Sequence, residues 1–202
     1  MKRISIFASG KGSDAGKIIE HFKGLTPNPS PERGMNATPI AEVSLVVSNK
    51  PDAGVLKIAE KNNIPTLIID KEKFFRGNGY VDELQELKTD LIVLAGFLWK
   101  IPLTLINAYR NRIINIHPAL LPKYGGKGLY GNFVHEAVLA NKEKESGITI
   151  HYVDEVYDHG DIIFQTRCPV MENDTPDTLA QRIHQLEHKH YPLIIEDIIQ
   201  KL

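Results

Sequence analysis

The chain has 202 residues, of which 42% are hydrophobic and 24% charged, ordinary values for a globular protein with one sizeable core. Its formal net charge of -1 excludes a global basic field, so nucleic-acid binding is not indicated. No run approaches the roughly 18 apolar residues of a membrane span, and the N-terminus lacks the features of a signal peptide. The single cysteine, Cys168, suits a reducing compartment, so we expect a cytoplasmic protein with neither a membrane nor a nucleic-acid partner.

Segments with the pattern of strands alternate with segments with the pattern of helices as far as residue 140. The expected strands are 3–8, 42–48, 65–70, 90–96 and 112–116. The expected helices are 14–22, 53–61, 80–87, 102–109 and 133–140, and four prolines within 26–39 predict a surface loop. Strands that are apolar throughout and separated by helices indicate a parallel sheet covered on both faces.

The pattern changes after residue 140. Residues 147–170 contain two extended runs joined by a polar turn that is too short for a helical crossover, so this pair is expected to be antiparallel. Residues 178–200 are expected to be helical with an interruption at Pro192. The sequence therefore predicts an α/β fold: a Rossmann-like, open, mostly parallel sheet with helices on both faces and an antiparallel strand pair near the C-terminal part. We expect one domain over residues 1–202.

Ligands of open α/β sheets bind beyond the carboxyl ends of the strands. The loops expected along that rim of the sheet cover residues 8–14, 48–52, 95–100 and 115–122. The first loop, SGKGSD, follows the first strand and opens a helix. Gly10 and Gly12 allow tight backbone geometry, and N–H groups at a helix N-terminus attract anions such as phosphate. The glycine spacing fits neither the dinucleotide fingerprint nor a P-loop. The simpler alternative is that Ser13 or Asp14 is an ordinary N-cap.

The fifth strand ends in Asn115-Ile116-His117-Pro118. Residues two apart on a strand point to one side, so Asn115 and His117 can face one point. A carboxamide N–H and an imidazolium N–H can both donate to a developing oxyanion, as acyl transfer requires, and a histidine also relays protons near neutral pH. The alternative is that both side chains satisfy buried backbone groups at the strand end.

The polar turn DEVYDHGD, residues 154–161, offers a carboxylate that could hold His117 and raise its pKa. The alternative is a solvated hairpin turn. Three histidines, His184, His188 and His190, raise the question of a metal. No HExxH pattern and no cysteine pair supports one, so a solvated or supporting role is favoured over zinc.

Six segments, in chain order, carry a resemblance to a known family: FASGKGSD, VVSNKPDAG, LAGFLWKI, INIHPALLPKY, GITIHYVDEVYDHGDIIFQ and LEHKHYPLII. Together they resemble the phosphoribosylglycinamide formyltransferases, the folate-dependent enzymes of purine synthesis. The stretch NIHPALLP is shared with other formyl-folate transferases and hydrolases, and the first loop points to the glycinamide ribonucleotide branch. The resemblance implies transfer of a formyl group from 10-formyltetrahydrofolate, a co-substrate, to the amine of 5'-phosphoribosylglycinamide. It implies small-molecule partners and no metal.

The resemblance also implies roles for individual residues. Asn115 and His117 would polarise the formyl group, while Asp158 would raise the pKa of His117 and organise a water that shuttles protons. The phosphoribosylglycinamide would be held by Gly10, Lys11, Gly12, Ser13, Asp14, Gly96, Leu98, Pro118 and Glu187. The folate would be held by Arg76, Leu98, Trp99, Lys100, Ile101, Asn115, Asp154, Glu155, Val156, Tyr157 and Asp158.

Four features depart from the family pattern. Asp14 stands where the family usually has Asn, and an acid beside a phosphate is repulsive, although the positive charges of Lys11 and of the helix end act against that repulsion. Trp99-Lys100 replaces a more usual Arg-Ile pair. The loop over residues 124–132 is longer than the family's, although His135 still aligns, and Arg76 is offset from the arginine that meets the folate tail.

Two kinds of alternative remain open. The first is another formyl-folate transferase or hydrolase; those acting on methionyl-tRNA or on the folate itself carry a second domain, which we do not expect here, and those acting on sugar nucleotides usually lack this glycine-rich loop. The second is a phosphosugar-binding α/β module without catalysis. Asp14 is the feature that favours the second alternative. The proline-rich insert over residues 25–40 has no assigned role.

Overall fold

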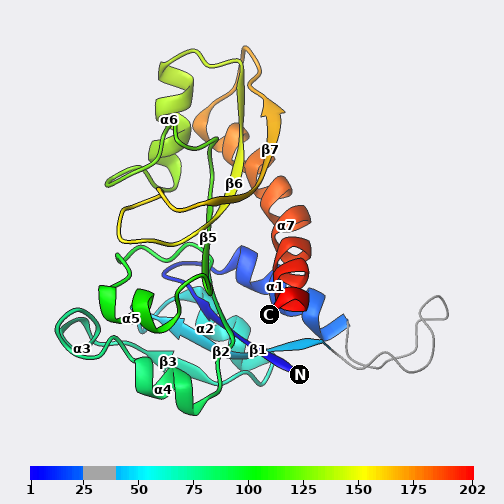
Figure 1. The fold of residues 1–202 in the computed structure, drawn as a ribbon. Helices are drawn as coiled ribbons and strands as arrows, with labels where there is room; N and C mark the ends of the chain where they lie inside the picture. Colours follow the sequence, from blue (N-terminus) through cyan, green and yellow to red (C-terminus); the bar gives the residue numbers. More distant parts are fainter. Residues whose placement is uncertain (25–39) are drawn as a thin grey trace.

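The computed structural model describes residues 1–24 and 40–202, so the proline-rich loop expected at 26–39 lies outside the described residues. Within the described part, one sheet has the strand order β3-β2-β1-β4-β5-β6-β7. The strands are β1 (Lys2–Phe7), β2 (Ala41–Ser48), β3 (Thr66–Ile68), β4 (Leu91–Leu94), β5 (Ile113–His117), β6 (Glu145–Tyr152) and β7 (Ile162–Pro169). β1 to β5 are parallel, and β6 and β7 form the predicted antiparallel pair beside β5 (Figure 1). The predicted fold class is confirmed.

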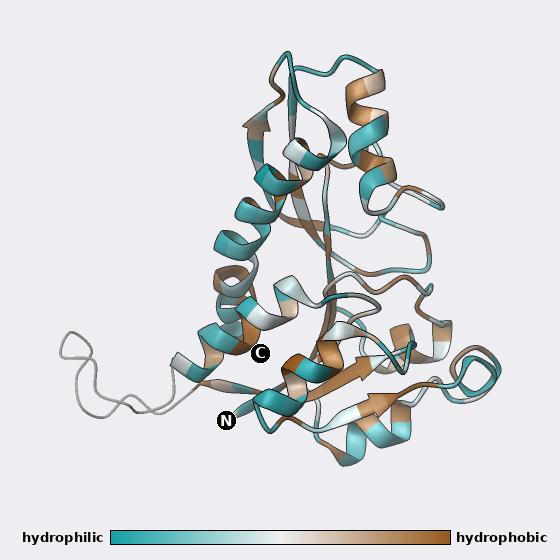
Figure 2. Cartoon of the chain, turned by 180° about the vertical axis from the view of Figure 1, so that it is seen from behind, coloured by the Kyte–Doolittle hydropathy of each residue, from teal (hydrophilic) through white to brown (hydrophobic). Residues whose placement is uncertain are grey.

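Helices cover both faces of the sheet. They are α1 (Ser13–Gly24), α2 (Gly54–Lys61), α3 (Lys71–Arg76), α4 (Val81–Glu86), α5 (Leu103–Ala108), α6 (Asn132–Ala140) and α7 (Pro176–Lys201). One apolar cluster joins the sheet to α1, α2, α6 and α7, and a second joins its other face to α3, α4 and α5. Ile4 and Ile6 of β1 enter the first cluster and Phe7 the second, as strand alternation requires. Figure 2 shows the apolar residues concentrated on the strands between these helices.

Two helices differ from the sequence prediction. α3 was not expected, because only Phe74 of its six residues is buried, which leaves no periodic pattern to detect. Asp70 starts this helix by accepting a hydrogen bond from the backbone N–H of Lys73 at 3.0 Å. The expected interruption at Pro192 was wrong, since α7 runs unbroken through it.

The continuity of α7 has a physical reason. Proline within a helix removes one backbone hydrogen bond and costs about 3 kcal/mol. Here Ile183 and Tyr191 before the proline, and Ile195 after it, are fully buried on the same face of the helix. Burying an aliphatic or aromatic side chain stabilises by about 1.5–3 kcal/mol each, so packing on both sides of Pro192 outweighs the local cost. Among the helices of the described residues, none combines the length and apolar character that a bilayer crossing requires.

Replacing Tyr191 by Phe is expected to lower the free energy of unfolding by about 1–3 kcal/mol. The hydroxyl is buried and donates to the carbonyl oxygen of Leu94, the last residue of β4, at 2.9 Å. Urea unfolding followed by circular dichroism measures the change. Tyr130→Phe is the matched control, because that ring is 49% exposed and should cost less than about 0.5 kcal/mol. Equal effects of the two substitutions would contradict a stabilising role for the Tyr191 hydroxyl.

Candidate functional site

A cavity of about 440 Å³ opens at the carboxyl ends of β4 and β5. Its walls come from the loops after these strands, the turn between β6 and β7, residues 126–132 and α7. Most of the residues expected at the site line it: Asp14, Gly96, Leu98, Trp99, Lys100, Ile101, Asn115, His117, Pro118, Asp154, Val156, Tyr157, Asp158 and Glu187. Segments separated by up to 173 residues of chain therefore meet around one cavity.

Ser9 ties the rim loops together, a role that the sequence did not suggest. Its hydroxyl donates to Asn49 Oδ1 at 2.6 Å and accepts from the backbone N–H of Leu98 at 3.0 Å. Its own backbone N–H donates to the carbonyl oxygen of Gly96 at 3.0 Å. The loops that follow β1, β2 and β4 are therefore fixed relative to one another, as expected of loops at one rim of a parallel sheet.

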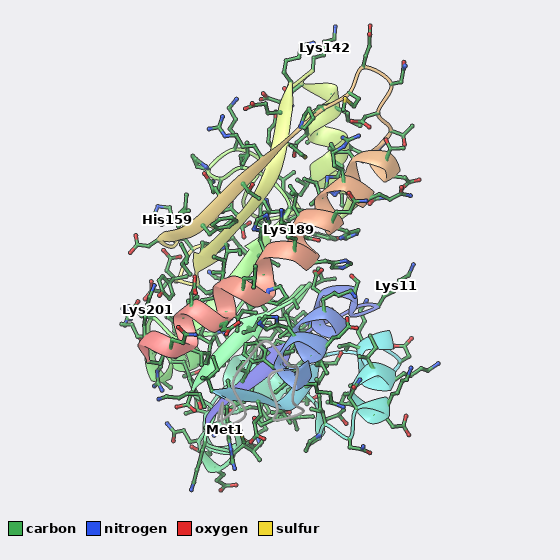
Figure 3. The ribbon with its side chains drawn as sticks, turned by 90° about the vertical axis from the view of Figure 1, so that its right-hand side faces the viewer. Met1, Lys11, Lys142, His159, Lys189 and Lys201 are labelled. Carbon is green, nitrogen blue, oxygen red and sulfur yellow. The ribbon has the colours of Figure 1, made fainter. Side chains whose placement is uncertain are left out.

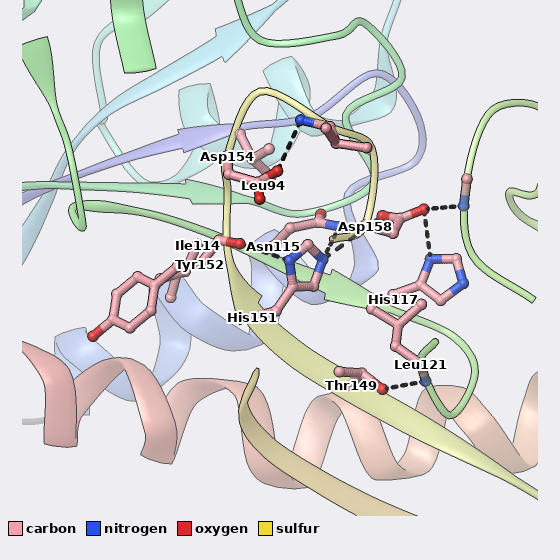
Figure 4. Close-up of polar contacts among 12 residues, drawn as sticks. Leu94, Ile114, Asn115, His117, Leu121, Thr149, His151, Tyr152, Asp154 and Asp158 are labelled. Carbon is pink, nitrogen blue, oxygen red and sulfur yellow. Dashed lines mark hydrogen bonds and ion pairs between the residues drawn. The ribbon is translucent and has the colours of Figure 1, made fainter. Parts of the chain in front are cut away.

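Asn115, His117 and Asp158 converge at the end of β5 (Figure 4). The distance from His117 Nδ1 to Asp158 Oδ2 is 3.6 Å, just beyond hydrogen-bonding range. The side chain of His117 is only 5% exposed and that of Asp158 12%. Asp158 has a φ of 54°, and its Oδ2 accepts from the backbone N–H of Gly126 at 2.8 Å. The hairpin turn and the loop after β5 thus hold the carboxylate against the ring.

The two nitrogens of His117 have different neighbours. Nε2 lies 2.7 Å from the carbonyl oxygen of Tyr124, which can only accept, so Nε2 carries a proton. In the neutral ring, Nδ1 is then an unprotonated nitrogen facing Asp158. Burial lowers the pKa of His117 and outweighs the Asp158 carboxylate and the Tyr124 carbonyl, which both act to raise it. The carboxylate therefore acts in the expected direction, but the net shift is downward because the ring is buried.

His151 is a further member of this group that the sequence did not single out. It lies opposite Asn115 in the antiparallel pair, and its Nδ1 donates to the carbonyl oxygen of Tyr152 at 2.8 Å. Its Nε2 is therefore free to accept from Asn115 Nδ2, 3.2 Å away, which fixes the orientation of the carboxamide. Burial acts to raise the pKa of Asp158, but the neighbouring rings of His151 and His117 and the backbone N–H of Gly126 together lower it. The carboxylate thus stays ionised near neutral pH.

Two acids and two histidines lie close together where α1 packs on α7, and Asp14, Glu187 and His184 of this group line the cavity. Asp14 lies in the first turn of α1, and its side chain is 13% exposed. On α7, Glu187 is buried and accepts from His184 Nδ1 at 2.6 Å, and this bond raises the pKa of His184. His188 Nε2 lies 3.3 Å from Asp14 Oδ1, but neither atom makes a hydrogen bond. Burial and the neighbouring charge of Glu187 raise the pKa of Asp14 to about 7.

This group has the ligand types of a cation site. Ligand atoms of Asp14, His184 and Glu187 lie within 4.8 Å of one another, the one such trio within residues 1–24 and 40–202. We assign no metal to it, because Glu187 and His184 already satisfy each other by a short charge-assisted hydrogen bond. His190, the third histidine considered from sequence, instead packs its ring on Phe164, 5.0 Å between centroids.

Some expected residues lie outside the cavity lining. Gly10, Lys11 and Gly12 form the loop before α1 and Ser13 is the first residue of that helix, and none of them lines the cavity; Figure 3 shows Lys11 extending away from the fold. Two other expected residues pair elsewhere: Arg76 with Glu72 at 3.0 Å and Glu155 with Arg110 at 3.3 Å. Their assignments to substrate or folate remain predictions.

The opposite wall of the cavity is more apolar. Trp99 packs against Phe74 and Phe97, with ring centroids 5.7 and 6.4 Å away, so a hydrophobic base supports the loop after β4. Lys100 Nζ lies 5.6 Å from the ring centre of Tyr157, which joins this loop to the β6–β7 turn. A flat aromatic ligand would find an apolar wall here and backbone polar groups at its edge.

His135 lines the cavity from α6, and residue spacing in the sequence did not predict it as a site residue. It is 2% exposed, and its Nδ1 has no hydrogen-bond partner. Burial lowers its pKa, so the ring is neutral at pH 7. Only the alignment with the family's histidine pointed to it from sequence.

Replacing Gly12 by Ala is expected to raise KM for a phosphosugar substrate about 10-fold or more, with a smaller change in kcat. Gly12 has a φ of 80°, and an added Cβ would lie 2.7 Å from Val55 Cβ, so the loop has to shift. Gly10→Ala in the same loop is the control, since nothing lies within 4 Å of its added Cβ. Steady-state kinetics of both variants measure the difference; a KM for Gly12→Ala no higher than for Gly10→Ala would exclude a binding role for this loop.

Comparison with known proteins gives one consistent result. Residues 2–195 match the Formyl transferase family. The chain is 41% identical to the chloroplastic phosphoribosylglycinamide formyltransferase of Arabidopsis thaliana over 99% of its length, but it spans only 66% of that protein. It is 36% identical to the phosphoribosylglycinamide formyltransferase of Bacillus subtilis over 98% of its own length and 95% of the relative.

The solved structures agree. The phosphoribosylglycinamide formyltransferase of Bacillus halodurans superposes with a TM-score of 0.83 at 36% identity, covering 99% of this chain and 96% of that one. The fold is therefore shared over nearly the whole of both chains. The chain belongs to the formyl transferase family and, within it, to the phosphoribosylglycinamide formyltransferases.

Proposed function

We propose that this protein transfers a formyl group from 10-formyltetrahydrofolate to the amine of 5'-phosphoribosylglycinamide, a step of purine synthesis. One observation carries the proposal: the carboxamide of Asn115, the imidazole of His117 and the carboxylate of Asp158 face one another at the edge of the cavity. Family membership supports the choice of formyl group and acceptor.

The proposed reaction begins with attack of the substrate amine on the formyl carbon. The formyl oxygen gains charge as the tetrahedral intermediate forms, and an N–H of Asn115 is placed to donate to it. The attacking amine nitrogen becomes positively charged and gives up one proton, which His117 accepts at Nδ1, so the ring becomes a cation beside the oxyanion and Asp158. Asp158 stabilises that cation and holds a water that passes the proton on to the tetrahydrofolate nitrogen, which leaves protonated as the carbon–nitrogen bond to the folate breaks.

We assign the two ends of the cavity to the two substrates. The side with Asp14, Glu187 and the glycine loop takes the phosphoribosyl group, because N–H groups at the start of α1 favour an anion. The side formed by residues 97–101 and 153–158 takes the pterin ring of the folate, because its wall is apolar and aromatic.

Two broader assignments belong to the same proposal. We place the activity in one domain over residues 1–202 and in the cytoplasm. The buried free thiol of Cys168, whose pKa is raised by burial, is consistent with a reducing compartment. The bacterial relative supports the location as well, whereas the plant relative is named as chloroplastic.

The test of the proposed function is turnover. The protein is mixed with phosphoribosylglycinamide and a 10-formyl folate, and release of the deformylated folate is followed by its absorbance. Product formation that requires both substrates is expected. Folate release without phosphoribosylglycinamide would indicate a hydrolase instead, and tight phosphosugar binding without turnover would indicate a non-catalytic binding module.

A further inference from the structure

Asp14 stands at the place in the cavity where an anionic ligand is expected, and an ionised carboxylate there would repel it. Its side chain is 13% exposed and lines the cavity, and Oδ1 is buried without a hydrogen-bond partner. α1 and α7 pack side by side (Figure 3). The groups that face Asp14 come from α7. They are Glu187, His184, His188 and Tyr191, while Lys17 of α1 faces His188 rather than Asp14.

The charges of this cluster do not balance if both acids are ionised. The charge of Glu187 is matched by His184, which donates to it at 2.6 Å and whose pKa is raised by that bond. His188 cannot match Asp14 at neutral pH, because burial and the neighbouring His184 lower its pKa. The one cation of the cluster is thus already paired, and a buried unpaired charge is costly. A proton on Asp14 removes the excess negative charge.

We propose that Asp14 acts as a neutral carboxylic acid that donates a hydrogen bond to the substrate phosphate, so that the phosphosugar and one proton bind together. This inference rests on the proposed function, because the phosphate of that substrate is the anion concerned. The proton comes from solvent and occupies a carboxyl oxygen of Asp14, which turns an acceptor into a donor without changing the size of the side chain.

Phosphate binding should weaken as the pH rises. The pKa of Asp14 is about 7 in the free protein, and an adjacent dianion raises it further. Well below pH 7 the acid is already protonated, and binding takes up no further proton. As the pH rises above 7, the affinity for a phosphate dianion falls toward about tenfold per pH unit. An amide at this position would donate at every pH.

Calorimetric titration with ribose 5-phosphate tests the proposal, because this probe has no amine and its phosphate is a dianion at pH 8. Binding is measured in two buffers of different ionisation enthalpy, which gives the number of protons taken up. The wild type is expected to take up nearly one proton at pH 8, and its Kd should rise about 10-fold between pH 7.5 and 8.5. Asp14→Asn should take up almost none, with a Kd that stays within about twofold.

His184→Gln and His188→Gln identify the group that titrates. Proton uptake that persists in both variants supports Asp14. Uptake that persists in Asp14→Asn but vanishes in either histidine variant assigns the proton to that histidine and overturns the proposal. If the wild type binds the phosphosugar without taking up a proton, the neutral-acid proposal is wrong but the proposed function stands. If it binds no phosphosugar at any pH, the proposed phosphosugar site is wrong.

Thermal unfolding gives a second measurement that needs no ligand. A buried acid with a raised pKa lowers stability as the pH rises from about 4 to 7, because the folded state then holds a proton that the unfolded state releases. The Tm advantage of Asp14→Asn over the wild type should therefore grow from pH 5 to pH 8. An advantage that does not change with pH would contradict the neutral acid.

Discussion

Asp158→Asn is expected to lower kcat by about 10²- to 10⁴-fold while changing the KM of either substrate less than about threefold. Asparagine has almost the same shape and tolerates the positive φ of 54° found here. Its carbonyl oxygen can still accept from the backbone N–H of Gly126, so the turn should keep its structure. What disappears is the charge that favours a protonated His117, which matters only as the transition state forms.

The control for this substitution is Asp161→Asn, an exposed acid in the same hairpin that does not line the cavity. It should retain the kinetic constants of the wild type. A second measurement separates a lost charge from a damaged structure: the NMR titration of His117 should move to lower pH in Asp158→Asn, because a cause that raises its pKa is removed. A large rise in KM with kcat intact would mean that Asp158 binds substrate and is not part of the chemistry.

His117→Ala is expected to cost about 10²- to 10⁴-fold in kcat, again with a small change in KM. In the proposed reaction the ring links Asp158 to the formyl carbon, because its Nδ1 lies 3.6 Å from Asp158 Oδ2 and its Nε2 is held by the carbonyl oxygen of Tyr124. Stopped-flow single turnovers isolate the chemical step from product release.

Because Ala also leaves a cavity, His117→Gln serves as a second variant of similar volume. His159→Ala is the control: this histidine follows Asp158 in the turn between β6 and β7, but its side chain is 73% exposed and pairs with Asp154 at 3.1 Å. Full activity of His117→Gln, with its folded spectrum unchanged, would show that the ring only fills space.

The strands that hold the site could be read from the sequence because each carries a local signal. The run DLIVLAG is apolar throughout, which indicates a strand buried on both faces, and β4 lies within it. The antiparallel pair was predictable because the chain between its strands is too short for a crossover. The short β3 and the six-residue α3 carry weaker signals, since few of their side chains are buried.

Helix α7 shows why a local sequence rule can predict a helix break that the folded protein does not have. The rule that proline ends a helix describes the local cost alone, whereas the burial of Ile183 and Ile195 on either side depends on α1 and β6, which sequence periodicity does not place. The same limit holds in the site. Asn115 and His117 share a strand, so their common direction was predictable, but the contact of His117 with Tyr124 involves a backbone oxygen and leaves no pattern.

Asp14 combines a feature that the local sequence shows with one that depends on tertiary packing. Its position in the loop was visible, and repulsion of a phosphate was expected from its charge. The second acid, Glu187, is 173 residues away in the chain, and only the packing of α1 on α7 brings the two together. The expected repulsion assumed an ionised side chain, whereas the folded environment favours the neutral one.

The position of β5 in the sheet has a consequence for the order in which the protein becomes functional. This strand joins the parallel part of the sheet to the hairpin of β6 and β7. During synthesis, the carboxamide and imidazole leave the ribosome 41 residues or more before the carboxylate at position 158, and α7 follows later still. A nascent chain that has folded only its first five strands would therefore already hold two of the three reactive groups, yet it would lack the carboxylate of Asp158 that activates them.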